Sequence, residues 1–153
     1  VESQSLETQA LFALTCQRWN GEGEPKCNST VVDSIEQTLL NNIRVQGRTA
    51  YIAYEGGQSA ALTTTALALS YFATPKEDAQ VVDNMDKLAN FVAQLGDPES
   101  GTSASASQML LSMQALGDYD MATDSSEPDL KVTIEQGSNT ILNEQFDSES
   151  NQT

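Results

Sequence analysis

The sequence contains no histidine, few basic residues, few aromatic side chains and only two cysteines. Without histidine there can be no Ser-His-Asp triad and no histidine-ligated zinc. Lysine and arginine number 7 against 22 aspartates and glutamates, which gives a net charge of -15. This charge excludes nucleic acid and anionic membrane surfaces as expected partners, and we interpret the acidity as a contribution to solubility.

Motifs that bind phosphate or dinucleotides are missing as well, so we expect no cofactor. Two cysteines at the observed spacing do not form a metal site, and no metal is expected. Acidic pairs such as Asp83 with Asp86, or Asp118 with Asp120, are most simply interpreted as solvated surface carboxylates. The sequence therefore predicts that the chain is not an enzyme.

Cys16 and Cys27 flank a loop rich in glycine and glutamate, which favours a local disulfide bond. Bonds to segments outside this chain, or two free thiols, are the alternatives. The sequons at Asn28 and Asn151 are candidate glycosylation sites, and with the disulfide they favour a secreted, extracellular glycoprotein. Because no initiator methionine or signal-like segment is present, we expect Val1 to be an internal or processed end.

Charge is also missing from two long stretches, residues 56–75 and 100–117. In a chain this acidic, an uncharged helix is one hidden on most of its surface. We therefore expect inner helices over residues 59–73 and 103–116. Several serine, threonine and glutamine side chains in the first stretch argue against a membrane-spanning helix.

Residues 78–95 instead form an amphipathic pattern and predict an outer helix that screens the inner ones. We expect Leu67 and Leu110 to be buried on the inner helices. On the outer helix, Asp83 and Lys87 should be exposed.

Helical spacing predicts two earlier helices, over residues 5–19 and 30–44, the second capped by Thr30. Residues 46–58 are expected to be irregular, with a short extended piece near Ile52. The apolar runs of the inner helices resemble one another at unequal intervals, which argues against a short-repeat solenoid. The pattern fits a mainly α fold, a partial α/α toroid of alternating inner and outer helices.

The pattern changes after the second uncharged stretch. Residues 130–134 alternate apolar and polar side chains, and residues 140–146 can return as a second strand. Because a lone hairpin is marginal in water, we expect a sheet completed elsewhere. The expected organisation is a helical segment at 1–120, a linker at 121–128 and a β segment at 129–153.

Three consecutive threonines, at residues 63–65, lie within the first expected inner helix. A threonine hydroxyl in a helix can bond to the carbonyl one turn earlier, which accounts for them structurally. Lining of a polar cavity is the alternative interpretation.

The order of elements over residues 59–146 resembles the end of the thioester-containing domain of the α-macroglobulin and complement family. The similarity lies in Ala61-Leu-Thr-Thr-Thr-Ala-Leu-Ala-Leu-Ser-Tyr71, the helix from Val81 to Leu95, Ser107-Gln-Met-Leu-Leu-Ser-Met-Gln-Ala-Leu-Gly-Asp-Tyr119 and Leu130-Lys-Val-Thr-Ile134. The resemblance implies that the toroid leads into strands of a CUB-like β-sandwich. It also implies a non-enzymatic part of a larger secreted parent chain, which reaches proteases or cell-surface targets in protease inhibition or innate-immune opsonisation.

The sequence departs from that family at its reactive centre. The Gly-Cys-Gly-Glu-Gln thioester motif is absent, as is the histidine that assists thioester chemistry in many members. Pro98-Glu-Ser-Gly-Thr102 replaces the usual Gly-Gly-aromatic turn. The resemblance therefore implies architecture and setting, with no reactive residue.

A second resemblance is to the cobalamin carriers, which also use an α/α toroid. Glu7-Thr-Gln-Ala-Leu-Phe-Ala-Leu-Thr-Cys16 is similar to their helix ending in Ala-Leu-Thr-Cys, and Ser107-Gln108 with Asp118-Tyr119-Asp120 is similar to their last helix. This alternative implies binding of cobalamin or another small ligand. A purely structural toroid is a third reading, whereas zinc-dependent prenyltransferases of the same fold need a histidine ligand.

Overall fold

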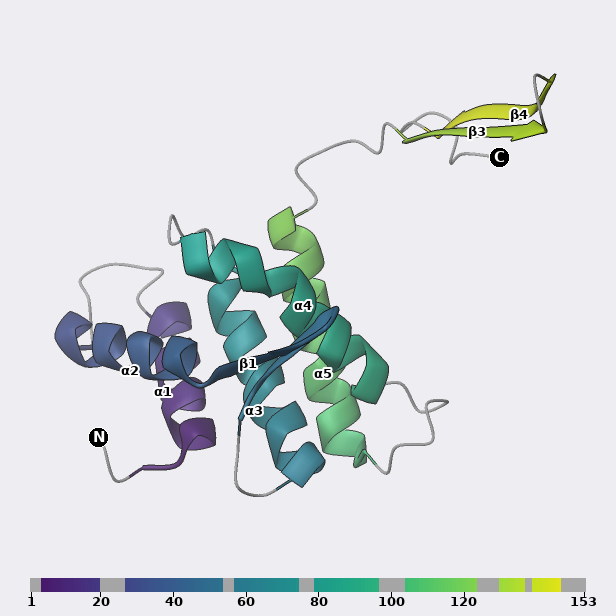
Figure 1. Cartoon of the computed structure of the whole chain (residues 1–153). Coiled ribbons are helices and arrows are strands. Elements are labelled where there is room, and N and C mark those ends of the chain that lie inside the picture. The colour runs from purple at the N-terminus through teal and green to yellow at the C-terminus, as the bar shows by residue number, and fades with distance from the viewer. Residues whose placement is uncertain are drawn as a thin grey trace. The chain divides into compact units, whose positions relative to one another are not determined.

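The computed structural model describes residues 4–19, 27–53, 57–74, 79–96, 104–123, 130–136 and 139–146. Contacts divide the chain into two compact units, Val1–Ala122 and Thr123–Thr153, and each is described by itself (Figure 1). The mainly helical fold class predicted from the sequence is confirmed.

The first unit is built from α-helices in two layers, with one β-hairpin. Its elements are α1 (Leu6–Trp19), α2 (Ser29–Asn41), β1 (Ile43–Gln46), β2 (Thr49–Ile52), α3 (Gly57–Phe72), α4 (Ala79–Gly96) and α5 (Ala106–Thr123). Helices α1, α3 and α5 form the inner row, and α2, α4 and the hairpin lie across them (Figure 1).

Helix α3 lies at the centre of the unit, as its lack of charge predicts. It packs against α1, α4 and β2, and apolar residues on all sides of it are buried. Leu67 is 5% exposed, which confirms the prediction for this residue. Its small alanines allow the neighbouring helices to approach closely.

Helix α5 differs from the prediction. Leu110 is 68% exposed, so its predicted burial is wrong, and only Ser112 and Ala115 of this helix are buried. The reason is position: α5 lies at the edge of the inner row, and no described residue covers its other face. The helix also continues past Gly117 to Thr123, because one glycine weakens a helix by only about 1 kcal/mol.

Helix α4 is the predicted outer helix. Its apolar stripe, with Val81, Leu88 and Val92, faces the core, and Asp83 is exposed as expected. Lys87 is half-buried, so its prediction is met only in part. Gly96 lies against Ser112 of α5, where an added Cβ would come within 2.6 Å of the serine Cβ. The missing side chain thus permits the close approach of α4 and α5.

The predicted helix over residues 30–44 is too long. Helix α2 ends at Asn41, and the chain enters an antiparallel hairpin in which Ile43 pairs with Ile52. Gly47 turns the hairpin with a φ of +61°, a conformation that glycine adopts without strain. β-branched side chains in both strands, and Tyr51 in β2, favour extended backbone over a further helical turn.

The second unit contains two antiparallel strands among its described residues. They are β3 (Leu130–Gln136) and β4 (Asn139–Phe146), which pair from Leu130 with Phe146 and have an irregularity between Ile134 and Glu135. The alternating pattern of the sequence therefore does form a strand, with a return strand beside it.

Candidate functional site

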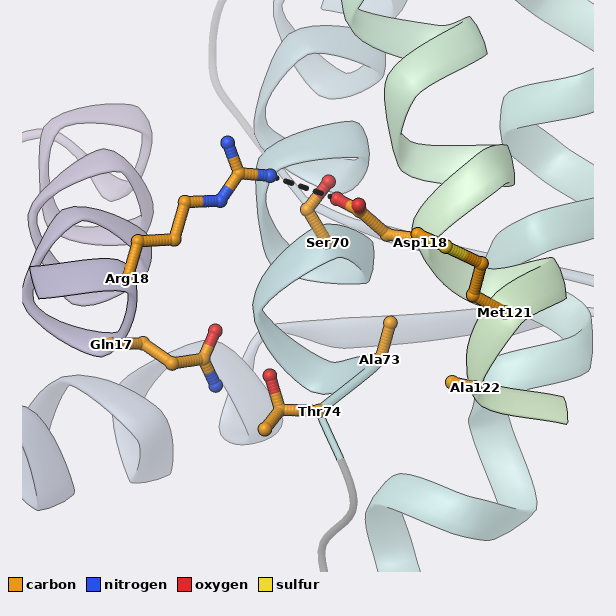
Figure 2. A pocket seen from close by; sticks show the side chains of 8 residues that line it. All are labelled: Gln17, Arg18, Ser70, Ala73, Thr74, Asp118, Met121 and Ala122. Carbon is orange, nitrogen blue, oxygen red and sulfur yellow. Dashed lines mark hydrogen bonds and ion pairs between the residues drawn. The ribbon is translucent and has the colours of Figure 1, made fainter. Parts of the chain in front are cut away.

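A cleft of about 450 Å³ opens where the last turns of α1, α3 and α5 converge (Figure 2). Its lining side chains are Gln17, Arg18, Ser70, Ala73, Thr74, Asp118, Met121 and Ala122. All three helices point their C-terminal ends toward this region. The helix dipoles therefore place partial negative charge around the cleft.

An ion pair crosses the cleft from α1 to α5. A terminal nitrogen of Arg18 lies 3.0 Å from Oδ2 of Asp118, and the two side chains are 51% and 23% exposed. With its amide oxygen turned toward Arg18, Gln114 accepts from both terminal guanidinium nitrogens, at 2.5 and 2.6 Å. An ion pair this exposed contributes at most about 1 kcal/mol to stability.

The hydroxyl of Ser70 is the unusual group of the cleft. Ser70 is 4% exposed, and its Oγ has no hydrogen-bond partner among the described residues. Figure 2 shows this oxygen pointing toward the ion pair of Arg18 and Asp118. A buried hydroxyl without a partner costs about 1–3 kcal/mol, so its presence needs an explanation.

The neighbouring polar groups of α3 already have partners. Gln17 donates from Nε2 to the carbonyl oxygen of Tyr71 at 2.9 Å and joins α1 to the last turn of α3. The Tyr71 hydroxyl donates to Oε2 of Glu36 at 2.7 Å. Burial raises the pKa of Tyr71 strongly, and its hydrogen bond to Glu36 and the charges of Glu36 and Asp33 raise it further. Tyr71 therefore stays protonated and ties α3 to α2.

The three threonines of α3 do not line the cleft. Thr64 is buried and donates to the carbonyl of Ala60 at 3.0 Å, as the structural interpretation predicts. Thr65 accepts from the backbone N–H of Ile52 at 3.0 Å and so holds β2 against α3. Thr63 bonds back to Ser59 and accepts from Gln108 of α5.

Cys16 and Cys27 form a disulfide bond with a Cα–Cα distance of 5.7 Å, which joins α1 to the start of α2. Asn28, the first candidate glycosylation site, is exposed and is the N-cap of α2. Its side chain accepts from the backbone N–H of Thr30 at 3.0 Å, so the predicted capping role of Thr30 is wrong. Asn151 lies outside the described residues.

The carboxylates that were expected to be solvated are not all without partners. Asp118 pairs with Arg18, and Oδ1 of Asp86 accepts from the hydroxyl of Tyr119 at 2.8 Å, whereas Asp83 is simply exposed. Across the described ranges, no group of three or more acidic, cysteine or histidine side chains could hold a metal ion. No described helix is long and apolar enough to cross a membrane.

Sequence reasoning named Asp118 only as a solvated surface carboxylate, and it missed Arg18 and Ser70. Each has a weak signal: Arg18 is the lone basic residue in the last turn of α1, and Ser70 interrupts an apolar run near the end of α3. Neither signal shows that the two helix ends meet.

Comparison of the chain with protein-family models, curated proteins and solved structures finds no match. What the molecule does has therefore to follow from its own residues.

Proposed function

We propose that this chain is a non-enzymatic segment of a secreted protein of the α-macroglobulin and complement type. The helical unit would be part of an α/α toroid, and the β unit would belong to a CUB-like sandwich. The parent molecule would act in protease inhibition or opsonisation. The absence of histidine, of a phosphate-binding motif and of an activated nucleophile supports a role without catalysis.

The observation that carries this proposal is a pair of uncovered apolar faces at the two ends of the inner row. On α1 the exposed large apolar side chains of this face are Leu11 and Phe12. On α5 they are Leu110, Met113 and Met121, opposite the buried face. Contiguous exposed apolar side chains mark surfaces that meet other protein.

Both faces suit an open row of helices that continues in a larger array. A helix at the end of such a row is apolar on two sides, since one side meets its neighbour within the unit and the other meets the next helix. Leu110, Met113 and Met121 follow one another at intervals of one helical turn or two, along one face of α5. The exposed stripe of α5 thus supports its assignment as an inner helix with a further neighbour.

The disulfide and the β unit support the remaining parts of the proposal. A bond between Cys16 and Cys27 suits an oxidising, extracellular setting, and Asn28 in its sequon is exposed. Two antiparallel strands alone are marginally stable, which favours their membership in a larger sheet.

Labelling of the native protein that contains this chain with methylamine tests the proposal. An intact thioester in the parent should incorporate methylamine covalently, at a residue outside the present 153. A Gly-Cys-Gly-Glu-Gln sequence upstream of Val1 would give the same answer. If the parent neither incorporates methylamine nor forms a stable complex with proteases, the immune assignment is wrong.

The cleft is the structural feature that bears on the alternative function, a cobalamin carrier. Ligand pockets of about 300–1,000 Å³ suit drug-sized molecules, and the cleft of about 450 Å³ would contact only part of a corrin ligand. Titration with cobalamin, followed by the visible absorbance of the corrin, separates the two readings. Tight stoichiometric binding without methylamine incorporation would favour the carrier.

A further inference from the structure

We propose that the cleft at the C-terminal ends of α1, α3 and α5 binds a small organic cation. The ammonium or guanidinium group of this ligand would lie between Asp118 and Ser70 and would replace Arg18 as the partner of Asp118. This inference does not depend on the proposed function, because every group that it uses lies in the helical unit.

The size and lining of the cleft suit a small molecule with one charged end. Its volume of about 450 Å³ falls within the usual range of small-molecule sites. Ala73, Ala122 and Met121 supply apolar contacts for the carbon chain of a ligand, and the hydroxyl of Ser70 lies beside the ion pair (Figure 2).

The charge of the cleft favours a cation. Three helix C-termini converge there, each with about half a negative charge, and Asp118 adds a carboxylate. Among the described residues that line the cleft, Arg18 is the one basic side chain, and the chain as a whole has a net charge of -15. An anionic ligand would therefore have to enter against the local and the overall charge.

The hydroxyl of Ser70 points to the same ligand. This oxygen is buried, has no partner among the described residues and is aimed at the ion pair (Figure 2). A hydroxyl oxygen readily accepts from an ammonium or guanidinium N–H. A cation beside Asp118 would thus complete the hydrogen bonding of a group that the protein itself leaves unpaired.

Arg18 acts in this picture as an internal competitor for the site. Its side chain is half-exposed and bonds to Asp118 at 3.0 Å and to the amide oxygen of Gln114. An exposed ion pair contributes little to stability. A ligand with a better fit can displace the guanidinium toward solvent. Loss of Arg18 should therefore strengthen the binding of a cation, whereas it would weaken the binding of an anion.

Titration of the ¹⁵N-labelled chain with n-butylguanidinium, followed by the chemical shifts of backbone amides, tests the inference. We expect saturable shifts confined to residues 17–18, 70–74 and 118–122. Butanol and butyrate, which have the same carbon chain without the positive charge, should give none. An arginine-containing pentapeptide with blocked ends distinguishes the sources: tighter binding than the free cation indicates a partner's side chain, and equal binding a free small molecule.

Three variants assign the contacts. Arg18→Met should bind butylguanidinium about two- to fivefold more tightly, because an exposed ion pair no longer competes. Asp118→Asn should bind about tenfold or more weakly, and Ser70→Ala about two- to tenfold more weakly. Arg48→Met and Asp83→Asn, which change exposed charges outside the cleft, are matched controls and should leave the affinity unchanged.

Two results would overturn the inference. One is the absence of saturable shifts in the cleft with both butylguanidinium and the peptide, while far-ultraviolet circular dichroism shows a folded chain. The other is saturable binding of butyrate that Arg18→Met abolishes, because the cleft would then be an anion site.

Discussion

At the scale of single residues, the buried hydroxyl groups of the helical unit are of two kinds. Thr64 and Thr65 hold hydrogen bonds, and Ser70 and Ser112 have no partner for their Oγ among the described residues. The two kinds differ in what their removal should do. Deleting a paired hydroxyl leaves its partner unsatisfied in the interior, whereas deleting an unpaired one removes a buried polar group at no loss of bonding.

Thr65→Val should therefore destabilise the chain by about 1–3 kcal/mol, because the backbone N–H of Ile52 loses its acceptor in the core. Ser112→Ala should be neutral or stabilising. The free energy of unfolding from urea denaturation measures both. Thr15→Val, on the exposed side of α1, is the control and should stay within about 0.5 kcal/mol. Equal losses for Thr65→Val and Ser112→Ala would contradict this distinction.

Single residues of the sequence did not reveal the cleft. Asp118 was recognised as an acidic residue, but its partner Arg18 is 100 positions away in the sequence. A single serine in an apolar run, such as Ser70, is ordinary in a helix that bonds its hydroxyls back to the chain. Only the meeting of three helix ends makes these residues one site.

At the scale of elements, α3 and α5 look alike in sequence and differ in the structure. Both run without charge for most of their length, so sequence reasoning treats both as inner helices. Absence of charge does not distinguish a helix covered on all sides from one whose second apolar face is uncovered. The packing of α3 was therefore predictable, and the exposure of Leu110 was not.

Leu67→Ala should destabilise the chain by about 2–5 kcal/mol, as expected for a leucine in a well-packed core. Leu110→Ala, at an exposed site, should change stability by no more than about 0.5 kcal/mol. This expectation replaces the large loss that burial of Leu110 would have implied. Thermal and urea unfolding of both variants provide the measurement, and comparable losses would show that α5 is covered in solution.

The glycines at Gly47 and Gly117 allow a second test at this scale, because neither has a neighbour that an added Cβ would meet. Gly47→Ala should destabilise the hairpin by about 1–2 kcal/mol, since its positive φ disfavours other residues. Gly117→Ala lies in a helix interior and should stabilise the chain by about 0.5–1 kcal/mol. Opposite signs in denaturant unfolding are the expected result, and a loss at Gly117 would place that residue outside regular helix.

At the scale of the whole molecule, periodicity and charge were enough to predict a mainly helical fold. The cysteine spacing indicated the Cys16–Cys27 bond, which is present. Strand β2 agrees with the extended piece expected near Ile52, whereas strand β1 was missed because Ile43 continues the apolar stripe of the preceding helix. In the structure, residues 43–45 are extended and pair with Ala50–Ile52. A local helical pattern does not contain the residues on which this pairing depends.

The uncovered apolar faces of α1 and α5 favour self-association of the chain, whereas its net charge of -15 opposes it. The salt concentration should therefore determine whether copies of the chain associate. At low ionic strength like charges keep copies of the chain apart. At about 1 M salt the Debye length falls to about 3 Å, and the apolar faces can associate. We expect sedimentation velocity to show a monomer at about 50 mM salt and self-association at about 1 M. The double variant Met113→Gln with Met121→Gln should suppress the association, whereas the control Val45→Gln on the hairpin should not. Equal association of the unchanged chain and both variants would mean that these apolar faces do not drive self-association.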